Sequence, residues 1–196
     1  MENNISGQKS RCQWAGNDSL YIKYHDEEWG VPVFDDYKLF EFLILETFQA
    51  GLSWLTVLRK RENFRQAFDN FDFEKVSLYS SEKIENLLQN KNIIRNKLKI
   101  NATISNAKAF IDVSREFGSF SKYIWDFVGQ KPITNSYKFM NELPAKTELS
   151  DKISKDLKKR GFKFVGATVM YAHMQATGMV NDHTTDCFRY DEINCL

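Results

Sequence analysis

The sequence is short of the features that mark membrane, secreted and disulfide-built proteins. Only three of its 196 residues are cysteine and three are proline. No apolar run is long enough to cross a bilayer, and the polar first ten residues lack the apolar segment of a signal peptide. We therefore expect a cytoplasmic protein without a membrane partner, in which thiols stay reduced and bind metals sooner than they form disulfides.

A strong net charge is also missing. Lysine and arginine total 27 against 26 aspartates and glutamates, which leaves a formal net charge of +1. No cationic field covers the whole molecule, so any nucleic-acid site must be a local patch. The chain is long enough to bury a sizeable core, and no repeat, low-complexity segment or long linker divides it.

The alternation of period two that is typical of strands is absent, and helical patterns run along most of the chain. Aspartate and serine caps and glycine stops delimit these patterns. We expect Asp35 or Asp36 to cap the first helix, Ser53 the second and Ser150 the sixth. The expected helices cover about 36–50, 54–68, 81–89, 95–117, 121–128, 151–160 and 166–177. The third is expected to open at Ser80 or Ser81 and the fifth at Ser119 or Ser121. The sequence therefore predicts an all-α fold.

Ligands for a soft metal lie near both ends of the chain: Cys12 and His25, then His183 and Cys187. Two thiolates and two imidazoles make a sufficient tetrahedral set for Zn²⁺. His183 and Cys187 are four residues apart and would share one face of a helical turn. Cys12 and His25 have no recognised finger spacing and could equally be core residues. Cys195 is most simply a free surface thiol.

Residues 39–48 read LFEFLILETF and are apolar nearly all round, which predicts a central helix. Glu46 falls on this helix three residues after Leu43 and four after Phe42, so its carboxylate lies on an apolar stripe. Burial disfavours its charge, and a buried acid needs a partner or a function. Glu46 either pairs with a basic side chain such as Arg59, lies at the helix edge, or serves a site.

Large aromatic residues gather in the first third of the chain: Trp14, Tyr21, Tyr24, Trp29 and Trp54. Such side chains build ordinary cores, but they also attract cations and stack on planar bases, at about 1–3 kcal/mol for each stacked base. With a carboxylate beside them, they suit a planar, electron-poor ring that carries N–H donors.

A basic turn follows at 157–166, which reads LKKRGFKFVG. Gly161 and Gly166 let backbone N–H groups approach a phosphate, and the start of the next helix favours an anion. Lys158, Lys163 and the two cations between them would add a local patch that grips a nucleic-acid backbone without reading its sequence. A hairpin of two helices with solvated lysines is the alternative.

These segments resemble a known family. The motifs YIKYHDEEWG at 21–30, ETFQAGLSW at 46–54, KKRGFKFVG at 158–166 and NDH at 181–183, followed by Cys187, are similar to those of type I DNA-3-methyladenine glycosylases. The resemblance runs from Arg11 to about Tyr190. It implies a bacterial, cytoplasmic, monomeric DNA-repair enzyme with a helix-hairpin-helix fold. We expect a flexible extension at 1–10, one compact domain at 11–190 and a tail at 191–196.

The resemblance also implies roles for single residues. Glu46 matches the catalytic pocket carboxylate, Tyr24 and Trp54 match the aromatic walls of the base pocket, and Tyr21 and Trp29 match positions beside it. The residues implied to contact DNA are the wedge residues Gly51 and Leu52 and the clamp residues Lys158, Gly161, Lys163 and Gly166. Those implied to hold one structural Zn²⁺ are Cys12, His25, His183 and Cys187.

The implied reaction is removal of 3-methyladenine from alkylated double-stranded DNA, with the free base as product. Methylation at N3 makes adenine cationic, and an aromatic pocket with a carboxylate favours that cation over undamaged adenine. The segment 167–177 holds no acid that could stabilise a sugar cation, and Asp182 adjoins the metal-ligand candidate His183. A monofunctional hydrolysis without a lyase step is therefore expected.

One departure and two alternatives remain. The family pattern carries a polar residue, often glutamine, two positions after the pocket glutamate, whereas this chain has Phe48. A zinc-dependent hydrolase is disfavoured, because four protein ligands leave no place for a water on the metal. A non-enzymatic, zinc-stabilised DNA-binding module with the same hairpin would need the lysines but no aromatic cage.

Overall fold

The computed structural model describes residues 9–195, so most of the extension predicted at 1–10 lies outside the described residues. The elements, in order, are η1 Gln13–Ala15, α1 Ser19–Glu27, α2 Asp36–Gln49, α3 Trp54–Leu58, α4 Arg61–Ala67, η2 Asp69–Phe71, α5 Phe73–Ser77, α6 Ser81–Gln89, α7 Lys97–Phe117, α8 Phe120–Asp126, β1 Ile133–Thr134, η3 Met140–Glu142, α9 Glu148–Lys159, α10 Ala167–Ala176, β2 Val180–Asn181 and α11 Phe188–Asn194. The protein is mostly helical, as predicted.

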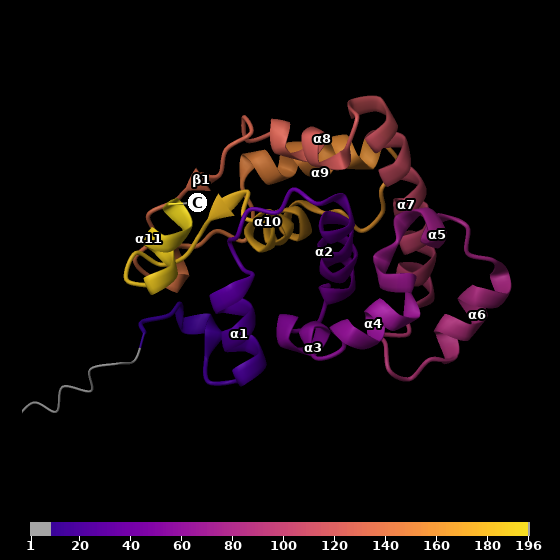
Figure 1. Ribbon diagram of the computed structural model, residues 1–196, viewed down its shortest axis with the longest axis horizontal. Coiled ribbons are helices and arrows are strands. Elements are labelled where there is room, and N and C mark those ends of the chain that lie inside the picture. The colour runs from indigo at the N-terminus through magenta and orange to yellow at the C-terminus, as the bar shows by residue number, and fades with distance from the viewer. Residues whose placement is uncertain (1–8, 196) are drawn as a thin grey trace, which may run out of the picture.

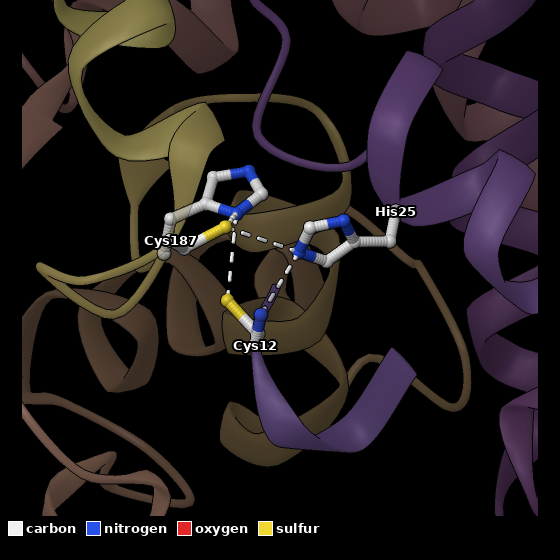
Figure 2. A group of neighbouring side chains, drawn as sticks. Cys12, His25 and Cys187 are labelled. Atoms are coloured by element: carbon white, nitrogen blue, oxygen red, sulfur yellow. Dashed lines mark hydrogen bonds between the residues drawn. The ribbon is translucent and has the colours of Figure 1, made fainter. Parts of the chain in front are cut away.

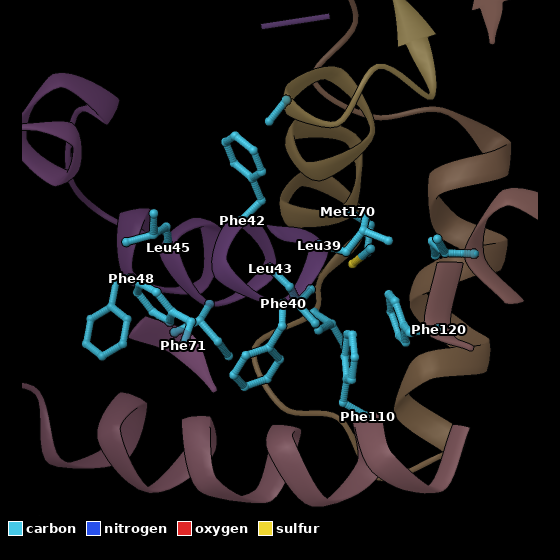
Figure 3. Packing of buried hydrophobic residues seen from close by; sticks show 14 of the residues in the cluster. Leu39, Phe40, Phe42, Leu43, Leu45, Phe48, Phe71, Phe110, Phe120 and Met170 are labelled. Carbon is cyan, nitrogen blue, oxygen red and sulfur yellow. The ribbon is translucent and has the colours of Figure 1, made fainter. Parts of the chain in front are cut away.

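Helix α2 forms the centre of the molecule. It packs on α10, α7, α8 and α3, and Figure 1 shows it between the α8–α9 layer and the short helices α1, α3 and α4. Its residues from Leu39 to Phe48 are all buried, including Glu41 and Glu46. Figure 3 shows its leucines and phenylalanines packed against Phe110 of α7, Phe120 of α8 and Met170 of α10. This helix is therefore the frame on which the surrounding side chains are fixed.

The capping residues and glycine stops in the sequence predicted several helix ends correctly. Asp35, Ser53, Ser80 and Ser119 each accept a backbone N–H at the start of α2, α3, α6 and α8. Gly118 ends α7 in the left-handed conformation, with φ +86°. The chain pattern alone therefore determines these boundaries.

Three local expectations were wrong. The helix predicted over 54–68 is broken between α3 and α4, where the side chain of Arg61 is buried against Glu41 and Glu28. Helix α9 is capped by Thr147 rather than Ser150 and begins at Glu148, because Thr147 and Ser150 each accept the other's backbone N–H. The strands β1 and β2 form a two-residue parallel pair that is too short to show a period of two.

The two ends of the described chain lie together. The backbone N–H of Phe188 donates to the carbonyl of Ser10 at 3.0 Å, and α11 continues to Asn194 with Ile193 buried. Ordered structure thus extends past residue 190, where the tail was expected to begin. Cys195 is exposed, as predicted. No helix among residues 9–195 is both long enough and apolar enough to cross a membrane.

Candidate functional site

A cavity of about 170 Å³ opens beside the C-terminal end of α2. Helices α1, α2, α3 and α10 and the loop around η3 enclose it. Its walls are formed by Trp14, Tyr21, Tyr24, Trp29, Glu46, Gln49, Trp54, Met140, Leu143, Ala172 and Gln175. All five residues predicted to form a base pocket, the glutamate and four aromatics, therefore lie around one cavity.

Glu46 supplies the carboxyl group of this cavity. It is 4 % exposed, and burial raises its pKa to about 8. Its Oε2 atom has no hydrogen-bond partner among residues 9–195. Arg59, the partner considered from the sequence, instead donates to Asp18 at 2.7 Å. The carboxylate is therefore buried, unpaired and available to a ligand.

Two aromatic groups flank the carboxylate. Tyr24 and Trp54 lie with ring centroids 5.4 Å apart, and the indole N–H of Trp54 has no partner within the described part of the chain. Trp14 packs on both Tyr21 and Trp29, at 4.9 Å between centroids in each case. Burial, followed by the charge of Glu46, raises the pKa of Tyr24, so this phenol remains protonated. The aromatic walls are thus closely packed around the carboxyl group, and both Glu46 Oε2 and Trp54 Nε1 lack a hydrogen-bond partner among residues 9–195.

Several lining residues were missed from the sequence. Trp14 was noted as an aromatic but given no place in the pocket. Gln49 lies one helical turn after Glu46, and Ala172 and Gln175 are three apart on α10, so helical spacing could have suggested these three. Met140 and Leu143 come from an irregular loop that carries no periodic signal.

Phe48 does not reach the cavity. Its ring is fully buried and packs on Phe64 at 4.7 Å and on Phe68 at 6.1 Å between centroids. Phe48 therefore forms no part of the pocket walls. The polar side chain beside Glu46 is Gln49.

The loop after α2 carries the predicted wedge. Gly51 adopts φ +86°, and Leu52 is 43 % exposed beside a second hollow that shares Glu46 and Gln49 with the first. The buried Lys99 of α7 donates to the carbonyls of Phe48 and Ala50 at 3.0 and 2.9 Å. The ammonium group therefore holds the C-terminal end of α2, and an apolar side chain projects from the loop next to the cavity entrance.

The basic turn between α9 and α10 is also built as a rigid unit. Gly161 has φ +94°, which only glycine adopts without strain, whereas Gly166 has an ordinary backbone at the start of α10. Asn106 of α7 binds both the N–H and the carbonyl of Lys163, at 2.7 and 3.1 Å. Ser154 donates to the carbonyl of Val165 at 2.6 Å. The turn is thus fixed from two neighbouring helices.

The cations of this turn are not equivalent. Arg160 is paired with Glu116 and Asp156, so its charge is already compensated. Lys158, Lys159 and Lys163 are exposed and form no ion pair in the described part of the chain. Of the predicted patch, these three side chains are free to meet an anion.

Cys12, His25, His183 and Cys187 come together, as the sequence predicted. All four are buried, and their ligand atoms lie within 4.8 Å of one another. The thiol of Cys187 is 3.4 Å from His25 Nε2 and 3.5 Å from His183 Nδ1, and Cys12 Sγ is 3.5 Å from the same Nδ1 (Figure 2). Tetrahedral Zn²⁺ with Zn–S and Zn–N bonds of about 2.3 and 2.0 Å needs ligand separations of about 3.3–3.8 Å. The donor set and these three separations fit zinc, and the widest spread among the four ligand atoms is 4.8 Å.

Both histidines of this cluster are oriented by a second hydrogen bond. His25 Nδ1 donates to Asp26 at 2.7 Å, and His183 Nε2 donates to the carbonyl of Trp29 at 3.0 Å. Each ring therefore presents its other nitrogen to the shared centre, which is the usual arrangement around a bound metal. The cluster also adjoins the cavity, since Trp29 forms part of the cavity wall.

Comparison with known proteins gives one consistent family. The family model for methyladenine glycosylase matches residues 14–190. The chain is 49 % identical over 178 residues to DNA-3-methyladenine glycosylase of Haemophilus influenzae, covering 91 % of this chain and 96 % of that protein. It is 49 % identical over 180 residues to DNA-3-methyladenine glycosylase 1 of Escherichia coli K12, covering 92 % and 96 %.

A solved structure agrees in fold. The structure of 3-methyladenine DNA glycosylase I from Staphylococcus aureus, solved to explain 3-methyladenine recognition, superposes on this chain with a TM-score of 0.90. The two proteins are 35 % identical, and the match covers 94 % of this chain and 98 % of that one. The helical fold and the aromatic, carboxylate-bearing cavity thus define a base-binding enzyme of the glycosylase class. The chain belongs to the methyladenine glycosylase family.

Proposed function

We propose that this protein removes 3-methyladenine from alkylated double-stranded DNA by monofunctional hydrolysis, as a base-excision repair glycosylase. The observation that carries this proposal is the buried, unpaired carboxylate of Glu46 inside an aromatic cavity. A neutral apolar ligand would have no use for a buried acid. A cationic, planar base would be attracted both by the aromatic faces and by the carboxylate.

The mechanism begins with the base leaving the duplex. A base inside the stack is beyond reach of a cavity, so it must be flipped out at a cost of a few kcal/mol. The exposed Leu52 would fill the space that the base leaves. Tyr24 and Trp54 would stack on the flipped base, and Glu46 would accept a hydrogen bond from its N–H edge.

Bond cleavage then depends on stabilising the leaving group. Water supplies the oxygen that bonds to the sugar carbon, the C–N bond breaks, its electron pair neutralises the cationic base, and the water proton is released. No acid lies between Ala167 and Ala176, and Asp182 is fully buried behind them. We therefore assign most of the rate to base binding and orientation, without a lysine nucleophile or lyase step.

Two further parts complete the proposal. The turn at 161–166 is the hairpin of a helix-hairpin-helix clamp, with Lys158, Lys163 and backbone N–H groups near Gly161 and Gly166 contacting phosphates. Cys12, His25, His183 and Cys187 hold one structural Zn²⁺, whose closed shell of four protein ligands supplies folding energy rather than a catalytic water. We place the enzyme in the bacterial cytoplasm, acting as a monomer.

The direct test is the identity of the released base. The purified protein is incubated with methylated duplex DNA, and the soluble products are separated by chromatography. We expect free 3-methyladenine and intact strands with abasic sites. A protein that binds the duplex through its lysines but releases no base would instead be the non-enzymatic module.

A further inference from the structure

A buried acid behind the cavity determines how one cavity residue is oriented. Asp182 has no exposed surface and is surrounded by three side-chain donors. Its Oδ2 accepts from the Tyr171 hydroxyl at 2.6 Å and from Gln175 Nε2 at 2.7 Å, and its Oδ1 accepts from Asn135 Nδ2 at 2.6 Å. A carboxylate in this setting accepts hydrogen bonds and offers none.

This arrangement fixes the amide of Gln175. Because Asp182 can only accept, the NH₂ group of Gln175 must face it, and the amide oxygen Oε1 must point the other way. Gln175 lines the cavity, and no side chain or backbone donor within residues 9–195 binds its Oε1. Its backbone is held as well, since Gly30 N donates to the Gln175 carbonyl at 3.0 Å. Gln175 thus presents a fixed acceptor to the cavity.

A fixed acceptor discriminates between purines. When N9 is bonded to the sugar, the amino group at position 6 is the N–H donor of an adenine, whereas guanine carries an acceptor oxygen at that position. We propose that Gln175, oriented by Asp182, is a specificity-determining residue that accepts a hydrogen bond from the 6-amino group of 3-methyladenine and disfavours 3-methylguanine. The inference rests on the proposed function and names the selectivity of the same site.

Glu46 does not make this role redundant. An amino group has two hydrogens, so it can serve the carboxylate of Glu46 and the amide oxygen of Gln175 together. A base with an oxygen at position 6 offers no donor to the fixed amide oxygen of Gln175, and a buried unsatisfied acceptor is costly. A protonated Glu46 could donate to that oxygen, so Gln175 rejects the oxo group where Glu46 alone would not.

Gln49 provides the natural contrast. It lines the same cavity, but no side-chain hydrogen bond orients its amide in the described part of the chain. Its amide can turn to present either the NH₂ group or the oxygen, so it can meet an amino group and an oxo group equally well. The same substitution at residues 49 and 175 therefore separates a fixed acceptor from an adaptable one.

The test compares two released bases from one substrate. Duplex DNA carrying both 3-methyladenine and 3-methylguanine is treated with the wild type, Gln175→Met and Gln49→Met, and kcat/KM is measured for each base. We expect Gln175→Met to lower the preference for 3-methyladenine by about three- to tenfold, the scale of one neutral hydrogen bond. Gln49→Met should keep the ratio of the wild type. A wild-type ratio in Gln175→Met would overturn the inference.

The orienting role of Asp182 is tested separately. In Asp182→Asn the new amide offers a donor as well as an acceptor, so the Gln175 amide can turn over and the ratio should fall as in Gln175→Met. Tyr171→Phe removes another donor from the same oxygen without freeing Gln175, and should leave the ratio unchanged. An unchanged ratio in Asp182→Asn, or an equal fall in Tyr171→Phe, would contradict the orienting role. A wild type that releases neither base would refute the proposed function itself.

Discussion

At the scale of single residues, the behaviour of Glu46 follows from its surroundings. The folded protein raises the pKa of Glu46 from 4.5 to about 8 through burial alone. Between these two pH values the folded state holds a proton that the unfolded state releases, so the free energy of unfolding falls as pH rises. The folded protein is thus less stable when Glu46 is ionised in an empty cavity. A cationic ligand would offset this loss of stability by pairing with the carboxylate.

The first prediction concerns stability. Glu46→Gln removes the ionisation, so the variant should gain stability relative to the wild type as pH increases from about 4.5 to 8. We expect the difference in melting temperature to grow by several degrees between pH 5 and pH 9. Thermal melts of both proteins at a series of pH values measure it. A difference independent of pH would show that Glu46 titrates normally.

The second prediction separates an enzyme from a binding module. Trp54→Ala removes a stacking face that is 8 % exposed and 5.4 Å from Tyr24. Affinity for free 3-methyladenine should fall by about 1–3 kcal/mol, while affinity for undamaged duplex stays close to that of the wild type. Calorimetric titration with the base and a filter assay with the duplex provide the two values. A variant that keeps both affinities would remove Trp54 from the pocket.

Residue patterns predicted the glutamate and aromatic residues of the cavity but not the residues that α10 contributes to it. Glu46 was identifiable because a carboxylate on an apolar stripe is conspicuous, and the aromatics because they cluster in sequence. Gln175 could not be identified from the sequence, because its orientation depends on Asp182, which in turn binds Asn135 from a distant loop. Asn135 and Asp182 are 47 residues apart, so no local sequence pattern predicts their hydrogen bond.

At the scale of elements, the turn between α9 and α10 is the clearest unit. Gly161 makes it possible, Asn106 and Ser154 hold it, and Lys158 and Lys163 remain unpaired. The sequence predicted the turn and its glycines. It did not predict that Arg160 would be neutralised, since Glu116 lies on another helix.

The third prediction concerns this turn. Neutralising Lys158 and Lys163 together by glutamine should weaken duplex binding at every sequence and reduce the salt slope by about two. Binding of free 3-methyladenine should be unchanged. A charge-matched control is Lys152→Gln with Lys155→Gln, on the face of α9 that adjoins Phe127. Equal losses in both double variants would mean that net charge, not the turn, governs binding.

The difference between local signals and tertiary contacts also explains which helix boundaries could be predicted. Caps and glycine stops are local, so α2, α6, α7 and α8 begin or end where the pattern indicates. The break between α3 and α4 depends on the buried ion pairs of Arg61, which join segments 20 and 33 residues apart. Tertiary contacts of this kind override a continuous helical pattern.

At the scale of the whole molecule, the cluster of cysteines and histidines joins the N-terminal part of the described chain to its C-terminal part. Cys12 and His25 come from the N-terminal segment, and His183 and Cys187 from the segment before α11. The sequence showed the ligands near both ends, but the meeting of those ends depends on the packing of everything between them.

The fourth prediction concerns the metal. Elemental analysis should find about one zinc per chain. Because binding energy at such a site is folding energy, Cys187→Ala should lower the melting temperature by more than about 10 °C. Cys195→Ala changes an exposed thiol and is the control, with no expected shift. Equal melting temperatures for the two variants would refute a structural metal.

The central claim is that ionised Glu46 pairs with a cationic base, and the pH dependence of kcat/KM for 3-methyladenine release tests it most directly. This parameter reports the free enzyme, in which the pKa of Glu46 is about 8. The wild type should therefore gain activity as pH rises and level off above pH 8. Glu46→Gln should show no such rise, and above pH 8 it should be slower by about 1.5–3 kcal/mol of transition-state stabilisation. The same profile in both proteins would contradict the account.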